Sequence, residues 1–108
     1  MITQLAASEL AAWREDAARE PPLVIDVREP WEYRYCHIDG TLSIPLGELP
    51  ARAHELPHGR ELVAVCHHGV RSLHAAGWLL RAGFPRVHNL RGGIAAWATD
   101  VDPTMPRY

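Results

Sequence analysis

Residues 62–72 read Leu62-Val63-Ala64-Val65-Cys66-His67-His68-Gly69-Val70-Arg71-Ser72. The first four residues form a short, uninterrupted apolar run, which is typical of a strand buried on both faces of a sheet. Apolar residues recur at helical spacing over Ser72–Ala82, and Gly83 is expected to cap the C-terminal end of that helix. The segment therefore predicts a buried strand, a tight loop and a helix in direct succession.

The rest of the chain repeats this alternation. A further strand is predicted in the apolar run at 23–25, and shorter strand candidates are 2–5, 42–44 and 87–90. Helices are predicted from Ser8, as N-cap, to about Arg19, over Gly47–Leu56 with an interruption at Pro50, and over Gly92–Ala98. Strands that alternate with helices are typical of βαβ units. The sequence therefore predicts an α/β fold with a central, mostly parallel sheet of about five strands.

Length and composition exclude several classes of protein. The 108 residues suit one domain, residues 1–108, and 47% hydrophobic against 22% charged residues is not the composition of a disordered chain. The net charge of −2 argues against nucleic acid or an anionic membrane as partner. All 11 basic residues are arginines, which excludes Schiff-base lysine chemistry. No stretch resembles a signal peptide or a membrane-spanning helix, so we expect a cytoplasmic protein with reduced thiols.

The loop that follows the buried run carries the chemistry. A tight turn between a strand and a helix N-terminus points its backbone N–H groups inward, where they bind anions and favour the thiolate form of a cysteine. Gly69 permits the backbone that such a turn needs, while Arg71 and protonated His67 or His68 would add positive charge. Cys66 is therefore the candidate nucleophile. The candidate substrate-binding loop is His67, His68, Gly69, Val70, Arg71 and Ser72.

The adjacent histidines, together with His74, could also suggest a metal site. We expect none, because side chains adjacent in sequence diverge and no partner stands at zinc spacing. The two cysteines are likewise too few for a disulfide framework or a four-cysteine zinc site. We place His67 and His68 at the rim of the pocket, where a partly protonated imidazole would favour a dianion. For His68, an exposed position without a role is an equal alternative.

Three motifs, in this order, resemble the rhodanese (thiosulfate sulfurtransferase) family. They are Leu23–Tyr33 continued by His37–Thr41 and Ile44-Pro45, the loop Cys66-x-x-Gly69-x-Arg71-Ser72, and Ala82-Gly83-Phe84 continued by Gly92-Gly93 and Trp97. The resemblance covers nearly the whole chain. It implies a rhodanese-like α/β domain whose central sheet is flanked by helices on both faces.

The resemblance also implies an activity. In such a sulfurtransferase a thiolate, here Cys66, takes the outer sulfur of thiosulfate or another sulfane donor as a persulfide. It then passes the sulfur to a thiophilic acceptor such as cyanide, a thiol or a sulfur-carrier protein. No metal or organic cofactor is implied.

Two other classes of function remain open. Binding or regulatory modules that resemble rhodanese typically lack the cysteine or the loop glycine, whereas this chain keeps Cys66, Gly69 and Arg71. Phosphatases and arsenate reductases share the fold. The loop from Cys66 to Arg71 is one residue shorter than the loop of tyrosine phosphatases, which favours sulfur over phosphate.

Two further positions receive supporting roles from the resemblance. Asp26 and Arg28 end the first buried strand at the same edge as Cys66. We expect them to hold the structure through ion pairs, Asp26 with Arg71 and Arg28 with Glu32.

Cys36 departs from the family pattern, which usually has glycine before His37. We expect a turn there that suits glycine better, so that Cys36→Gly is at least as stable as the parent protein. We also expect Cys36 to lie too far from Cys66 for a disulfide, which requires Cα atoms about 4.4–6.8 Å apart.

Overall fold

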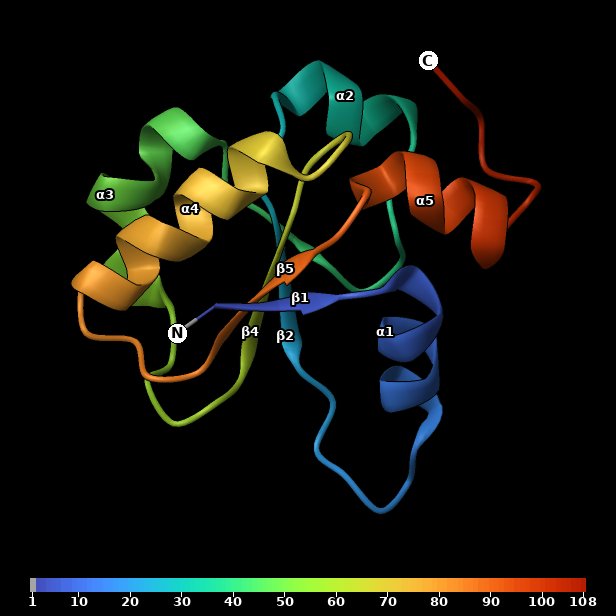
Figure 1. The fold of residues 1–108 in the computed structure, drawn as a ribbon. Helices are drawn as coiled ribbons and strands as arrows, with labels where there is room; N and C mark the ends of the chain where they lie inside the picture. Colours follow the sequence, from blue (N-terminus) through green and yellow to red (C-terminus); the bar gives the residue numbers. More distant parts are fainter. Residues whose placement is uncertain (1) are drawn as a thin grey trace.

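The computed structural model describes residues 2–108, in which strands and helices alternate (Figure 1). The strands are β1 (Ile2–Leu5), β2 (Leu23–Asp26), β3 (Leu42–Ser43), β4 (Leu62–Val65) and β5 (Val87–Leu90). The helices are α1 (Ala7–Glu15), α2 (Pro30–Tyr35), α3 (Leu49–Arg52), α4 (Val70–Arg81) and α5 (Gly93–Asp100). Two short 3-10 turns, Leu46–Glu48 and Ala53–Glu55, flank α3.

All five strands pair in parallel in one sheet, in the order β1-β5-β4-β2-β3. Strand β4 lies at the centre, and all four of its residues are buried. This confirms the predicted parallel sheet, and it confirms that the apolar run before Cys66 is a strand covered on both faces.

Two separate hydrophobic clusters cover the two faces of the sheet. Helices α1 and α5 pack with Val63 and Val65 on one face, while α3 and α4 pack with Leu62 and Ala64 on the other. The alternation arises because successive side chains of a strand point to opposite faces. Figure 1 shows the two helix layers on either side of the sheet, which confirms the prediction of helices on both faces. No helix within residues 2–108 is long and apolar enough to span a bilayer.

Several helix boundaries differ from the predicted ones because the capping groups differ. Helix α1 has Ala6 rather than Ser8 as N-cap, and the carboxylate of Glu9 accepts the Ala6 N–H at 2.8 Å. It ends at Glu15, since the Asp16 side chain accepts the N–H of Ala18 at 2.9 Å and turns the chain. Helix α4 begins two residues before the predicted start, because Gly69 caps it with φ +101°.

Two segments have a different helix content from the prediction. The expected helix over Gly47–Leu56 is divided into 3-10, α and 3-10 turns, and Pro50 lies in the first turn of α3, where proline is tolerated. Helix α2 was not predicted. Its signals are Pro30 in the first turn and Glu32, whose carboxylate accepts the Glu29 N–H at 2.9 Å.

The glycine-like turn expected at Cys36 is absent from the structure. The Cys36 backbone, at φ −160° and ψ 149°, is extended and suits any residue, and its side chain is 7% exposed within the hydrophobic cluster on the α1 and α5 face. Glycine there would remove buried side-chain contacts and add chain entropy to the unfolded state.

We therefore expect Cys36→Gly to lose about 1–2 kcal/mol of unfolding free energy in urea titrations. Cys36→Ser, which keeps the backbone restraint, isolates the contribution of the side chain. A Cys36→Gly protein as stable as the parent would show that this position needs the flexibility of glycine.

Candidate active site

Cys66 is the first residue after the central strand β4, at the edge of the sheet where the parallel strands end. Its residue surface is 1% exposed, and the loop to α4 closes around its sulfur. Open α/β sheets bind ligands at this edge. The structure thus brings together the predicted nucleophile, the loop 67–72 and the end of β2 at Asp26.

Two donors lie within hydrogen-bonding distance of the sulfur. The Gly69 N–H donates to the Cys66 Sγ atom at 3.0 Å, and the Ser72 hydroxyl lies 3.2 Å from Sγ. Gly69 reaches this position through its positive φ, the backbone conformation expected of this glycine. A sulfur that carries negative charge would be stabilised by both groups.

Asn89 on β5 accepts a hydrogen bond from the Ser72 hydroxyl. The sequence analysis did not predict a role for this residue. Its amide N–H groups donate to the Gly69 carbonyl at 3.2 Å and to Gln4 Oε1 at 3.0 Å, so its Oδ1 faces Ser72 at 2.5 Å. The hydroxyl has one proton, which serves either Asn89 or the sulfur of Cys66 at any moment. The available signal was an asparagine within the predicted strand 87–90, just before Gly92-Gly93.

The other side of the loop is held by the start of α5. The N–H groups of Ile94 and Ala95 donate to the carbonyls of Cys66 and His67 at 2.9 and 3.1 Å. Gly93 lies against the same carbonyls at φ +59°, and a Cβ there would stand 2.3 Å from the Cys66 oxygen. Backbone groups of α5 therefore hold the first residues of the loop that follows β4.

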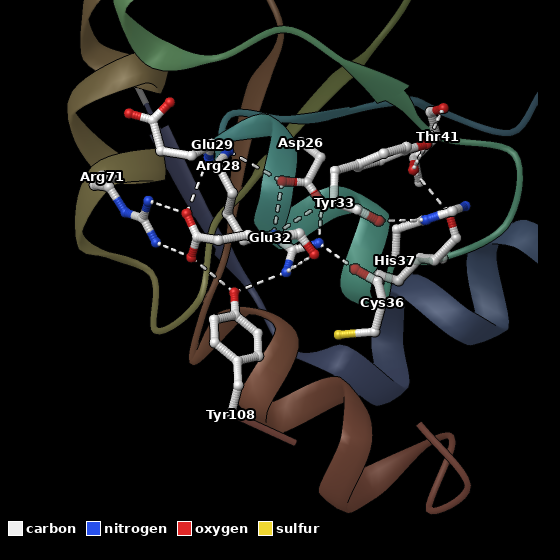
Figure 2. Close-up of polar contacts among 11 residues, drawn as sticks. Asp26, Arg28, Glu29, Glu32, Tyr33, Cys36, His37, Thr41, Arg71 and Tyr108 are labelled. Carbon is white, nitrogen blue, oxygen red and sulfur yellow. Dashed lines mark hydrogen bonds and ion pairs between the residues drawn. The ribbon is translucent and has the colours of Figure 1, made fainter. Parts of the chain in front are cut away.

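Arg71 does not pair with Asp26 as predicted; it pairs with Glu32 (Figure 2). The guanidinium donates two hydrogen bonds to the carboxylate, at 2.7 and 2.9 Å, and Glu32 is 4% exposed. These bonds lower the pKa of Glu32 from 4.5 to about 2, and the same carboxylate raises the pKa of Arg71. The positive charge expected of Arg71 is thus matched by a buried anion.

Arg28 does not pair with the Glu32 carboxylate; it folds back on Asp26, with Nη2–Oδ2 at 2.7 Å. It also donates to the Cys36 carbonyl at 2.8 Å and to the Tyr108 hydroxyl at 2.7 Å. Burial opposes its charge, but Asp26 and Tyr108 outweigh that effect and raise the pKa of Arg28. Asp26 and Arg28 therefore connect the end of β2 to the end of α2. They support the structure as expected, but they pair with each other rather than with Arg71 and Glu32.

Tyr108 joins the two ion pairs, as Figure 2 shows. Its hydroxyl accepts from Arg28 and donates to Glu32 Oε2 at 2.8 Å, and burial raises the pKa of Tyr108 to about 12. Nothing in the motifs marked this residue. Its hydrogen-bond partner Glu32 lies 76 residues earlier in the sequence.

His67 and His68 do not diverge as expected. Their rings stack with centroids 4.0 Å apart, and the other face of His67 stacks on Tyr108 at 3.9 Å. Burial lowers the pKa of His67 and so favours the neutral form of its ring. Both histidines line a cavity of about 160 Å³ beside the loop, and within residues 2–108 no cluster of three acidic, His or Cys side chains could hold a metal ion.

The two thiols are free and pack in different clusters. Cys36 belongs to the cluster on the α1 and α5 face, whereas Cys66 belongs to the α3 and α4 face. The sheet between the two faces agrees with the expectation that they do not form a disulfide.

The ion pair of Glu32 predicts an acid-sensitive fold. A carboxylate whose pKa falls on folding adds stability above its ordinary value of 4.5, and that stability is lost as the pH falls toward about 2. We expect Glu32 to contribute about 2 kcal/mol of the stability lost between pH 7 and pH 3. Urea unfolding at both pH values should show a smaller acid loss for Glu32→Gln than for the parent. Glu48→Gln, which removes an exposed partner of Arg52, should lose as much as the parent.

The chain is similar to known proteins along most of its length. Residues 6–100 match the family model described as Rhodanese-like domain. A sulfurtransferase from Allochromatium vinosum is 37% identical over 91% of this chain and 90% of its own length. A putative sulfur carrier protein from Bacillus subtilis is 43% identical over 68% of this chain, a match that spans 40% of that longer protein.

A solved structure confirms the fold. The rhodanese-related protein from Thermoplasma volcanium superimposes with a TM-score of 0.82 at 27% identity, over 92% of this chain and 93% of its own. Together with the matched family model, this confirms the resemblance of the three motifs. The chain therefore belongs to the Rhodanese-like domain family of sulfurtransferases and sulfur carriers.

Proposed function

We propose that this protein transfers sulfane sulfur through a persulfide on Cys66. The observation that supports the proposal most is the environment of the sulfur. It lies at the N-terminus of α4, with the Gly69 N–H at 3.0 Å and the Ser72 hydroxyl at 3.2 Å. Membership of a sulfurtransferase and sulfur-carrier family supports it independently.

The first half-reaction is a displacement at sulfur. The Cys66 thiolate bonds to the outer sulfur of thiosulfate, the sulfur–sulfur bond of the donor breaks, and sulfite leaves with the electron pair. In the second half-reaction an acceptor attacks the outer sulfur of the persulfide. Cyanide then gives thiocyanate, a thiol gives a new persulfide, and the Cys66 thiolate is restored.

The residues of the loop stabilise charge rather than move protons. The Gly69 N–H and the Ser72 hydroxyl face the anionic sulfur, while His67 and His68 line the cavity beside the loop. We assign the remaining loop residues, Val70 and Arg71, to the substrate-binding loop as well. A thiolate needs no general base, and the reaction as proposed uses no metal or organic cofactor. The cellular acceptor is a thiol or a sulfur-carrier protein, in keeping with the sulfur-carrier relative in Bacillus subtilis.

Intact mass after incubation with thiosulfate tests the proposal. We expect one added sulfur, mapped to Cys66, that disappears when cyanide is added. A binding module would gain no sulfur. A phosphatase would instead hydrolyse a small aryl phosphate faster than it transfers sulfur, an outcome that would overturn the assignment.

A further inference from the structure

The Ser72 hydroxyl lies between two acceptors that compete for its one proton. The distance from Ser72 Oγ to Asn89 Oδ1 is 2.5 Å, whereas the distance to the Cys66 Sγ atom is 3.2 Å. A carbonyl oxygen at the shorter distance holds the proton more firmly than a neutral sulfur, which is a weak acceptor. While the sulfur of Cys66 is neutral, the hydroxyl therefore donates to Asn89.

The amide of Asn89 is held so that it cannot avoid this competition. Its Nδ2 group donates to the Gly69 carbonyl at 3.2 Å and to Gln4 Oε1 at 3.0 Å, which keeps Oδ1 directed at Ser72. Asn89 is 2% exposed, and a buried carbonyl oxygen that loses its donor is destabilised. The hydroxyl can therefore turn to an anionic sulfur only by leaving the Asn89 oxygen without a donor.

The thiolate and the persulfide of Cys66 differ in where they carry their charge. In the thiolate the negative charge is on Sγ itself, which then competes with Asn89 for the hydroxyl proton. In the persulfide the charge is on the added outer sulfur, and Sγ, bonded to carbon and sulfur, is neutral. The thiol and the persulfide therefore leave Ser72 bonded to Asn89, whereas the thiolate does not.

We propose that Asn89 is a positioning residue that favours the persulfide of Cys66 over the empty thiolate. This inference rests on the proposed function. Asn89 acts through the Ser72 hydroxyl on a balanced exchange, in which the thiolate and thiosulfate give the persulfide and sulfite. One S–S bond forms as another breaks, the net charge is unchanged, and no proton or oxidant enters. The protein thereby retains its sulfur until an acceptor arrives.

Other titratable groups surround Cys66, and the test leaves all of them in place. Within residues 2–108, none of these groups forms a hydrogen bond with Ser72 or Asn89. Helix α5 contributes one titratable side chain, at its last residue. The groups on the neighbouring elements are Arg71 of α4, Glu32 of α2, Asp26 and Arg28 at the end of β2, His67 and His68 in the loop, and Tyr108.

The test measures two equilibria of Cys66 in the parent protein, Asn89→Leu, Ser72→Ala and the double variant. The first is the pH at which alkylation of Cys66 by iodoacetamide, located by peptide mapping, reaches half its limiting rate. The second is the ratio of persulfide to thiolate at fixed concentrations of thiosulfate and sulfite, measured by intact mass at a pH above that midpoint.

The decisive quantity is the difference between the effect of Asn89→Leu in the parent and its effect in Ser72→Ala. Through Ser72, we expect Asn89→Leu to lower the alkylation midpoint by about one pH unit and the persulfide-to-thiolate ratio by about tenfold. The two factors agree because the thiol and the persulfide share one orientation of the hydroxyl. Loss of the bond to the Gly69 carbonyl acts equally with and without the hydroxyl, so it cancels in this comparison.

Ser72→Ala alone keeps the inference testable even if Asn89→Leu does not fold. It should raise the midpoint of the parent by less than about threefold in proton concentration, because the hydroxyl is already engaged by Asn89. His88→Leu is the matched control on β5: it removes a polar side chain that packs against Trp13 on the opposite face of the sheet. Both equilibria should stay within about twofold of the parent.

The outcomes are distinguishable. A tenfold rise of the midpoint in Ser72→Ala alone, or equal effects of Asn89→Leu with and without the hydroxyl, would overturn the role of Asn89 while sulfur transfer stands. If thiosulfate adds no sulfur to Cys66 in any of these proteins, the proposed function fails and the preference for the persulfide fails with it. The alkylation midpoints then still decide whether Asn89 competes for the hydroxyl.

Discussion

Cys66→Ala is expected to abolish the transfer of sulfur from thiosulfate to cyanide, leaving less than about one-thousandth of the parent rate. The Gly69 N–H and the Ser72 hydroxyl can stabilise an anionic sulfur, but neither can form a covalent sulfur intermediate. Formation of thiocyanate, followed by colorimetry, measures the loss. The variant should remain folded, because alanine is small and apolar and the loop is held through backbone groups.

Cys36→Ser provides the matched control. It removes the other thiol from the opposite face of the sheet, and it should keep the transfer rate within about threefold of the parent. Thiocyanate formation by Cys66→Ala at the parent rate would show that sulfur transfer does not pass through Cys66. Loss of turnover in a folded Cys36→Ser protein would instead indicate a two-cysteine redox mechanism.

Gly93→Ala is expected to cost about 3 kcal/mol or more of unfolding free energy, and with it the ordered nucleophile loop. The backbone at φ +59° is unfavourable for any side chain, and the new Cβ would meet the carbonyl oxygens of Cys66 and His67 at 2.3 and 2.5 Å. Those atoms are backbone and cannot rotate away. The contact breaks only if α5 or the loop moves.

Thermal and urea unfolding measure this effect, and sulfur loading measures its consequence for the site. Gly77→Ala on α4 is the matched control, because the nearest atom to its new Cβ is the flexible end of Arg81 at 3.3 Å. It should be neutral or more stable by about 0.5–1 kcal/mol, since alanine favours helix. A Gly93→Ala protein within 1 kcal/mol of the parent would mean that the approach of α5 to the loop is looser than described.

Local patterns predicted the strands well. The apolar run at 62–65 has the bounds of β4, because burial on both faces leaves an uninterrupted apolar signal. The segments 2–5 and 87–90 also have the bounds of β1 and β5, although each has polar residues at its two middle positions. Helix ends were less predictable. They depend on which group caps them, and the capping groups of α1 and α4 became evident only in three dimensions.

The site was predictable where one short segment contains it. Cys66, Gly69 and Ser72 meet within a single turn, and their types and spacing indicate that geometry. The ion pairs were predicted wrongly because the sequence shows charges but not distances. Arg28 finds its partner two residues away, while Arg71 reaches 39 residues to Glu32. Asn89 and Tyr108 act through contacts between distant segments, which no local pattern encodes.

The strand order has a consequence for how this molecule acquires its structure. Strand β1 is an edge strand that pairs with β5. The backbone hydrogen bonds of β1 can therefore form only after Val87 and Asn89, the partners of Ile2 and Gln4, have been synthesised. Contacts of such sequence separation slow folding, because a long loop must close before they form. On the ribosome, β1 and the Cys66 loop therefore emerge well before β5 and α5, the elements that hold them. The thiol of Cys66 is thus synthesised before α5, whose N–H groups bind the carbonyls of Cys66 and His67.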